Sequence, residues 1–93
     1  MKKNNEKKPT NLSDAIRQRV VEIENEKKIT LKEVSENGEL AYDTLISFME
    51  GRTNIIKITT LFKICNGLGI SLHDFFNSPI FNDKLNEMEF KFQ

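Results

Sequence analysis

Apolar residues recur at intervals of three and four positions from residue 12 to residue 76, in short runs separated by glycine or by polar residues. An α-helix has about 3.6 residues per turn, so this spacing places the apolar side chains on one face of each helix. No convincing alternation of apolar and polar residues, the mark of a half-buried strand, precedes residue 79. The pattern predicts an all-α protein of five short helices around one core.

Capping residues mark the first two helices. Asn11 and Ser13 are both candidates for the N-cap of a helix over about residues 13–26. The stretch TLKE at residues 30–33 is a capping-box pattern, in which the threonine hydroxyl accepts from the glutamate N–H and the glutamate side chain reaches back. A second helix therefore begins there, and it ends near Gly38.

Three more helices follow after short connections. Only residues 38–40 (GEL) separate the second helix from a third over about 42–50. The loop GRTNIIK at 51–57 leads to a fourth helix over about 58–68, which a glycine terminates. SLHD begins a fifth helix at residues 71–76.

The apolar faces of these helices predict the core. Spacing assigns to it Leu12, Ile16, Val20, Ile23, Leu31, Val34, Leu45, Phe48, Met49, Ile58, Leu61, Phe62, Cys65, Leu68, Phe75 and Phe76.

Size and composition argue against an enzyme. A chain of 93 residues builds a modest core but rarely a deep cleft. Cys65 lies on an apolar helix face, as an inert thiol does, and His73 lacks the neighbouring set of acid and base residues that catalysis would need. One cysteine and one histidine make no metal cluster, so we expect no catalytic residue, no metal and no cofactor.

Charge and hydropathy divide the chain into three parts. Net charge is zero, but residues 1–10 carry four lysines and one glutamate, which predicts a flexible basic arm. That arm has no apolar segment behind its lysines, and no apolar run approaches the ~18 residues of a membrane span. We therefore expect a cytoplasmic protein with a domain over 11–78 and a tail over 79–93.

The tail has two interpretations. Phe81, Leu85, Met88 and Phe92 fit one helical face, whereas Met88, Phe90 and Phe92 fit one face of a strand. Together with Ile80, these apolar residues are too many to stay solvated. They pack either on the domain or on a partner.

The stretches ITLKEVSENGELAYDTLISFMEGRTN and TLFKICNGLGISLHDFF resemble the phage-repressor/Cro type of helix-turn-helix regulator, often called XRE-like. The resemblance covers roughly residues 13–77 without insertion. It is most specific at Thr30 with Glu33, at the pair 44–45, at Gly51 and in the closing LGISLHDFF. It implies a compact five-helix domain with the helix-turn-helix at helices two and three, and a sequence-specific regulator of transcription, a repressor, that binds double-stranded DNA.

By position in the family motif, the third helix lies in the major groove. The resemblance assigns base contacts to Tyr42, Asp43, Ser47 and Ile46, and phosphate contacts to Thr44, Arg52, Thr53, Asn54, Lys57 and Lys32. The carboxylate of Asp43 suits cytosine N4, and Ile46 suits a thymine methyl.

The chain departs from the family pattern at several positions. Leu31 stands where many members have a phosphate-binding glutamine, and Ala41 where they have a serine or threonine N-cap. Glu24 and Met49 replace a buried arginine–glutamate pair between the first and third helices, and the turn glycine comes one residue early, at Gly38. A different function therefore stays open, that of a protein-interaction module such as an antitoxin or adaptor.

Family members usually pair on DNA, so the resemblance also implies a homodimer. The unassigned apolar residues of the tail are the expected contact: Ile80, Phe81, Leu85, Met88, Phe90 and Phe92.

Overall fold

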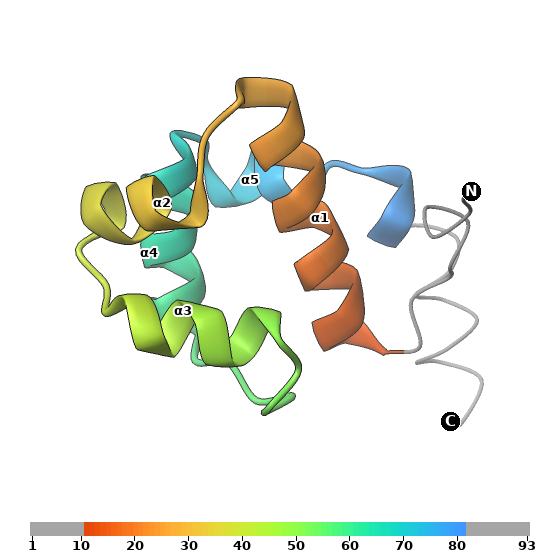
Figure 1. The fold of residues 1–93 in the computed structure, drawn as a ribbon. Helices are drawn as coiled ribbons and strands as arrows, with labels where there is room; N and C mark the ends of the chain where they lie inside the picture. The colour runs from red at the N-terminus through yellow and green to blue at the C-terminus, as the bar shows by residue number, and fades with distance from the viewer. Residues whose placement is uncertain (1–10, 82–93) are drawn as a thin grey trace, which may run out of the picture.

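Five α-helices follow one another in this computed structural model, which describes residues 11–81 (Figure 1). Their bounds are α1 Leu12–Lys27, α2 Leu31–Gly38, α3 Tyr42–Met49, α4 Ile58–Leu68 and α5 Leu72–Phe76. No residue from 11 to 81 lies in a strand. The predicted all-α fold is confirmed, and every helix lies within one residue of its expected bounds.

Side chains from all five helices form one core. The buried apolar residues are Ala15, Ile16, Val20, Ile23, Val34, Leu45, Phe48, Leu61, Ile64, Cys65, Leu68, Phe75 and Phe81. Ile80 packs against this cluster, and the Phe81 ring lies with its centroid 4.9 Å from that of Phe76. These two tail residues therefore pack on the domain, while the four apolar residues that follow lie outside the described part of the chain.

The core prediction was wrong for one face of α4. Leu61, Ile64, Cys65 and Leu68 form the buried face, and Ile64 was not among the expected residues. Phe62 is exposed because each residue advances by about 100° around the helix, which turns its side chain away from Leu61. Ile58 is exposed at the first turn, where the helix begins beyond the edge of the core.

Four other residues expected in the core are less buried than predicted. Leu12 and Phe76 are exposed at the ends of their helices. Leu31 and Met49 are half-buried and pack on the edge of the core. The terminal turns of a helix have fewer neighbouring elements. A residue there can lie on the apolar face of the helix without being fully buried.

The helix starts follow the capping signals. Asn11 is the N-cap of α1, since its Oδ1 accepts from the Asp14 N–H at 2.8 Å. The alternative cap, Ser13, is buried instead. At α2 the capping box is present, with the Glu33 N–H donating to Thr30 Oγ1 at 3.1 Å and the Thr30 N–H donating to Glu33 Oε1 at 2.9 Å.

Two glycines let α2 and α4 approach closely. A Cβ on Gly38 would lie 2.2 Å from the Lys63 carbonyl oxygen, and one on Gly67 would lie 2.1 Å from the Val34 carbonyl oxygen. The left-handed turn after α2 is made by Glu39 itself, at φ 56°. The early glycine therefore serves helix packing, and the turn lies one residue later, where a glycine had been expected.

Within residues 11–81, none of the helices has both the length and the apolar character needed to cross a membrane.

Candidate nucleic-acid interface

The outward face of α3 is set by two buried anchors. Leu45 and Phe48 lie in the core, and α3 follows α2 after only three residues, Glu39 to Ala41. In Figure 1, α3 runs along the lower edge of the molecule. Met49 packs on the edge of the core, and the remaining side chains of α3 are exposed or half-buried.

The four residues expected to contact bases all lie on this helix, but they differ in exposure. Tyr42 and Asp43 are exposed in the first turn, and Ile46 and Ser47 are half-buried one turn later. Thr44, expected at a phosphate, is exposed between them. The phenol and the two hydroxyls of this helix can donate to base edges or to phosphate oxygens, whereas the carboxylate only accepts and suits a base donor.

Lys32 joins this face from α2. Its Nζ lies 5.9 Å from the centroid of the Tyr42 ring, within cation–π range, and 4.0 Å from Glu36 Oε2. Both charged side chains of the ion pair are mostly exposed, so the pair is weak and leaves the ammonium group available.

Arg52 lies in the loop after α3, where its Nη2 is 2.6 Å from Glu50 Oε1. This pair is also exposed, so solvent and salt screen it. The basic residues around α3 thus alternate with carboxylates, and the surface is neither uniformly basic nor uniformly acidic.

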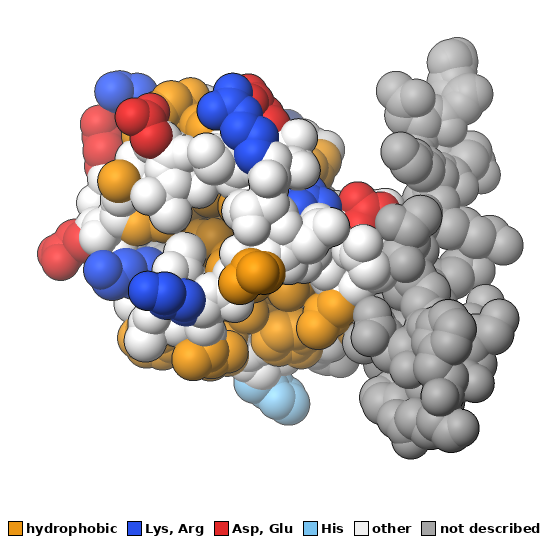
Figure 2. Space-filling model, turned by 90° about the horizontal axis from the view of Figure 1, so that it is seen from below, with side chains coloured by type: hydrophobic (Ala, Val, Ile, Leu, Met, Phe, Trp, Pro, Cys, Tyr) orange, Lys and Arg blue, Asp and Glu red, His pale blue; other side chains and the backbone are white. Residues whose placement is uncertain are grey.

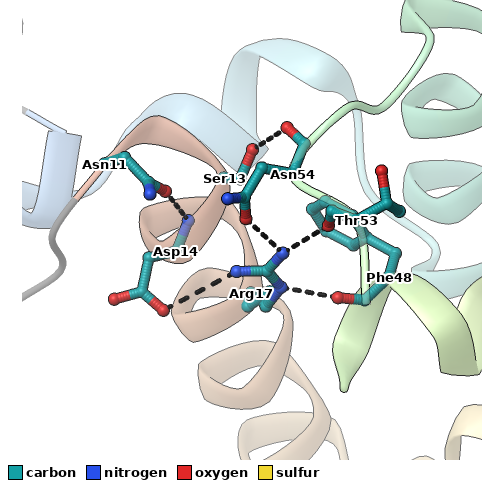
Figure 3. Close-up of polar contacts among 7 residues, drawn as sticks. All are labelled: Asn11, Ser13, Asp14, Arg17, Phe48, Thr53 and Asn54. Carbon is teal, nitrogen blue, oxygen red and sulfur yellow. Dashed lines mark hydrogen bonds and ion pairs between the residues drawn. The ribbon is translucent and has the colours of Figure 1, made fainter. Parts of the chain in front are cut away.

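A half-buried arginine of α1, Arg17, holds the same loop in place (Figure 3). Arg17 Nε donates to the Phe48 carbonyl at 2.5 Å. Its Nη2 donates to the Thr53 carbonyl at 2.6 Å and to Asn54 Oδ1 at 2.9 Å. The Ser13 hydroxyl donates to the Asn54 carbonyl. Side chains from one helix therefore fix both the end of α3 and the backbone of the loop that follows.

Arg17 was not identified from the sequence. Glu24 and Met49 do not form the arginine–glutamate pair that the family buries between α1 and α3, but Arg17 links the two helices in another way, through a backbone carbonyl group of α3. Asp14, 3.9 Å from Arg17 Nη1, adds an ion pair on the same side. The sequence shows only that an arginine follows Ile16, which is buried. The spacing of residues does not reveal which backbone carbonyl, 31 positions away, that arginine binds.

The two polar residues of the loop keep donors for a ligand. Thr53 Oγ1 accepts from the Ile55 N–H at 3.1 Å, so its hydroxyl hydrogen remains free to donate. Asn54 Oδ1 accepts from Arg17, which fixes the orientation of the amide and leaves its Nδ2 hydrogens as the donors.

Two helix starts in this region have no side-chain cap. Ala41, before α3, and Lys57, before α4, offer no acceptor to the first N–H groups of their helices. Uncapped N–H groups at a helix start carry partial positive charge and suit a phosphate oxygen. Lys57, which is exposed, adds its ammonium group at the start of α4.

Cys65 and His73 lie away from this surface. Cys65 is buried, and desolvation raises the pKa of its thiol to about 11, although the nearby charge of Arg19 lowers it in part. His73 is exposed on α5 beside a shallow, open depression lined by Leu72, Phe76 and Asn77. Among residues 11–81, no three acidic, histidine or cysteine side chains are grouped as a metal site would need.

Comparison with known proteins gives one informative match. No protein-family model matches the chain, and no curated protein matches it. The chain is similar to a solved structure described as the crystal structure of the prophage Lp1 protein 11, with 31% sequence identity and a TM-score of 0.69. The similarity covers 80% of this chain and 97% of that one. The chain therefore belongs to the same family as prophage Lp1 protein 11.

Proposed function

We propose that this protein is a sequence-specific regulator of transcription, a repressor, that binds double-stranded DNA through a helix-turn-helix formed by α2 and α3. The observation that carries the proposal is the placement of α3: Leu45 and Phe48 anchor it, and its polar residues face outward beside a rigid loop. The likeness to a prophage protein supports a phage-associated role.

In this proposal α3 enters the major groove. A helix with its side chains is about 10–12 Å across, which matches the width of that groove. Tyr42, Asp43, Ile46 and Ser47 would contact base edges. Because Tyr42 and Asp43 are the more exposed, they reach further toward the bases, and Ser47 requires closer approach of the helix.

The loop and the adjoining helix starts would bind the backbone. The proposed phosphate ligands are Thr44, Arg52, Thr53, Asn54, Lys57 and Lys32. Arg17 makes no such contact; it positions the loop through Phe48, Thr53 and Asn54. A loop that is already ordered in the unbound protein loses less conformational entropy on binding DNA than a mobile loop does.

The activity is binding alone, without catalysis, metal or cofactor. A single helix in the groove reads only part of a turn, so the protein would act as a homodimer on two half-sites roughly 34 Å apart. The competing function, a protein-interaction module of antitoxin or adaptor type, is favoured by the carboxylates of Asp43, Glu36 and Glu50 near the same surface.

Selection from random duplex DNA separates the two functions. The full chain should enrich a palindromic sequence, and its affinity for that duplex should fall with added salt as phosphate contacts release counterions. A Ser47→Ala or Tyr42→Ala variant should lose about 1–3 kcal/mol at particular base pairs and bind other sequences as before. If no sequence is enriched and no duplex binds at low salt, the interaction module is the correct function.

A further inference from the structure

One exposed contact joins the two helices of the proposed helix-turn-helix. Lys32 lies in the first turn of α2, and Tyr42 is the first residue of α3. The Lys32 Nζ lies 5.9 Å from the centroid of the Tyr42 ring, so the ammonium group faces the π-system of the phenol. Within residues 11–81 the other contact of this kind joins Arg17 to the buried Phe48. We call the exposed one the Lys32–Tyr42 contact.

Interactions within α2 give Lys32 little stabilising role. A cation in the first turn of a helix faces the positive end of the helix dipole, which disfavours it. The ion pair with Glu36 joins atoms 4.0 Å apart on side chains that are 74% and 64% exposed, so solvent screens most of the attraction. The lysine also precedes the glutamate, which is the less favourable order for such a pair on a helix.

The ring of Tyr42 is only partly covered by the domain. The residue is 46% exposed at the beginning of α3, and Ala41 before it provides no side-chain cap. An exposed tyrosine on the first turn of a helix can occupy more than one χ1 rotamer, and fixing one of them on binding costs conformational entropy. A cation over the ring favours the rotamer that brings the two groups together.

We propose that Lys32 is a positioning residue for Tyr42: its ammonium group holds the phenol ring in the orientation from which the hydroxyl contacts a base. This inference rests on the proposed function and adds that the base preference at Tyr42 depends on a residue of the neighbouring helix. In the proposed docking, α2 meets the DNA backbone and α3 enters the groove. A lysine that contacts both a phosphate and the tyrosine ring would link the position of the backbone to the base that is read.

The charges around α3 make the position of each single cation important. Figure 2, seen from below Figure 1 and therefore from the side of α3, shows basic and acidic side chains interspersed on this face. The effect of a cation among carboxylates depends on its own neighbours, and Lys32 has the Tyr42 ring as one of them. Lys57 is also exposed and is also a proposed phosphate ligand, but it lies before a different helix, α4, and is the matched control.

NMR spectroscopy of the full chain without DNA tests the contact itself. In the natural chain the Tyr42 ring should shift the Lys32 Hε resonances upfield, and the couplings of Tyr42 should indicate one dominant χ1 rotamer. Tyr42→Leu should remove the upfield shift, whereas Tyr42→Phe should keep it. Lys32→Gln should leave Tyr42 averaging over rotamers, whereas Lys32→Arg should keep the dominant one because it retains a cation over the ring.

Binding to two duplexes tests the positioning role. The first duplex carries the sequence that the natural chain selects, and the second differs at the base pair for which Tyr42→Ala loses its preference. Lys32→Gln should weaken binding to both duplexes, because a phosphate contact is lost. It should also reduce the ratio of the two affinities by about two- to fivefold, the range expected for a cation–π contact at an exposed site. Lys32→Arg should restore the ratio, and Lys57→Gln should weaken binding without changing it.

Three results would overturn the inference and leave the proposed function intact. An unchanged affinity ratio in Lys32→Gln would make Lys32 a phosphate ligand alone. A ratio that falls equally in Lys32→Gln and Lys32→Arg would mean that Lys32 contacts the base directly. Lys32 Hε resonances that are the same in the natural chain and in Tyr42→Leu would exclude the contact in the free protein. If the natural chain selects no duplex, the proposed function fails and the positioning role fails with it, even where the upfield shift confirms the Lys32–Tyr42 contact.

Discussion

Arg17 of α1 contacts Phe48 of α3 in two ways: its Nε donates to the Phe48 carbonyl at 2.5 Å, and its guanidinium carbon lies 4.6 Å from the centroid of the Phe48 ring. The carbonyl belongs to the last turn of α3 and also accepts from the Gly51 N–H at 3.0 Å, so Arg17 is its second donor. One cation therefore binds the end of the helix and packs on its buried anchor. The position of α3 relative to the core depends on this contact.

Replacing Arg17 with methionine should lower the free energy of unfolding by about 2 kcal/mol, because the variant keeps an apolar stem but leaves the Phe48 and Thr53 carbonyls without their charged donor. Urea denaturation measures this loss. Hydrogen exchange should also show faster exchange of the amides in residues 51–55. Arg52→Met is the control, since its ion pair is exposed and should change stability little.

Gly67→Ala should destabilise the protein by about 1–3 kcal/mol or more, even though alanine is the better helix former. The added methyl would lie 2.1 Å from the Val34 carbonyl oxygen, so α2 and α4 would have to separate. Thermal unfolding followed by circular dichroism gives the comparison. A Gly67→Ala protein as stable as the natural one would show that the two helices are not in close contact.

Gly51→Ala separates steric from conformational effects. Gly51 has φ 81° and nothing within 4 Å of its added methyl. The expected loss is only the cost of a left-handed alanine, about 1 kcal/mol. It should therefore fall below the loss for Gly67→Ala.

Removing the charge of Glu50 should strengthen DNA binding. Its carboxylate lies 2.6 Å from Arg52 and competes with phosphate for the guanidinium. Glu50→Gln should raise affinity for all duplexes to a similar extent, and Arg52→Ala should lower it and flatten the salt dependence. Fluorescence anisotropy on selected and unrelated duplexes measures both. A change of sequence preference in Arg52→Ala would mean that Arg52 contacts bases and that the proposed docking is wrong.

The helices were predictable because each carries its own local signals. The capping box at Thr30 and Glu33, and the terminator Gly69 at φ 76°, act within a few residues and are readable from spacing alone. Burial was less predictable. Leu61 and Phe62 are adjacent apolar residues of α4, and both fit the apolar spacing. Which of them faces the core depends on where the neighbouring helices lie.

The exposure of the candidate residues at the start of α3 was predictable, and the contacts that hold the neighbouring loop were not. Tyr42 and Asp43 are exposed as the family motif implies, while Arg17 acts on the Asn54 side chain across 37 positions of sequence. Contacts from a side chain to a distant backbone carbonyl leave no pattern in a single sequence. The packing role of Gly38 was hidden for the same reason, because its close neighbour is the Lys63 carbonyl.

Glu24 should make stability depend on pH. Burial raises the pKa of its carboxyl above the usual value, so the folded protein binds this proton more tightly than the unfolded chain does. The contribution is therefore favourable at low pH and is lost as the pH rises from the unfolded pKa through the folded one. Glu24→Gln should raise stability at pH 7 relative to the natural chain, and the gain should shrink toward pH 4. Glu26→Gln, on an exposed residue of the same helix, is the control. A gain that is equal at both pH values would show that burial does not disfavour the carboxylate of Glu24.

Cys65 should be nearly unreactive in the folded protein. Its side chain is 1% exposed, and desolvation raises its pKa from 9.0 to about 11, so the thiolate that attacks an alkylating reagent is roughly a hundredfold scarcer at pH 8 than in the unfolded chain. Iodoacetamide labelling followed by mass spectrometry should show slow modification under native conditions and rapid modification in urea. The ratio of the two rates should exceed the hundredfold expected from ionisation alone, because the reagent must also reach a buried sulfur. Gly67→Ala provides an internal check, since Gly67 lies two residues along α4 and the looser contact with α2 should speed native labelling. Rapid labelling of the natural chain without denaturant would mean that the core around α4 opens often, and the buried face assigned to that helix would have to be revised.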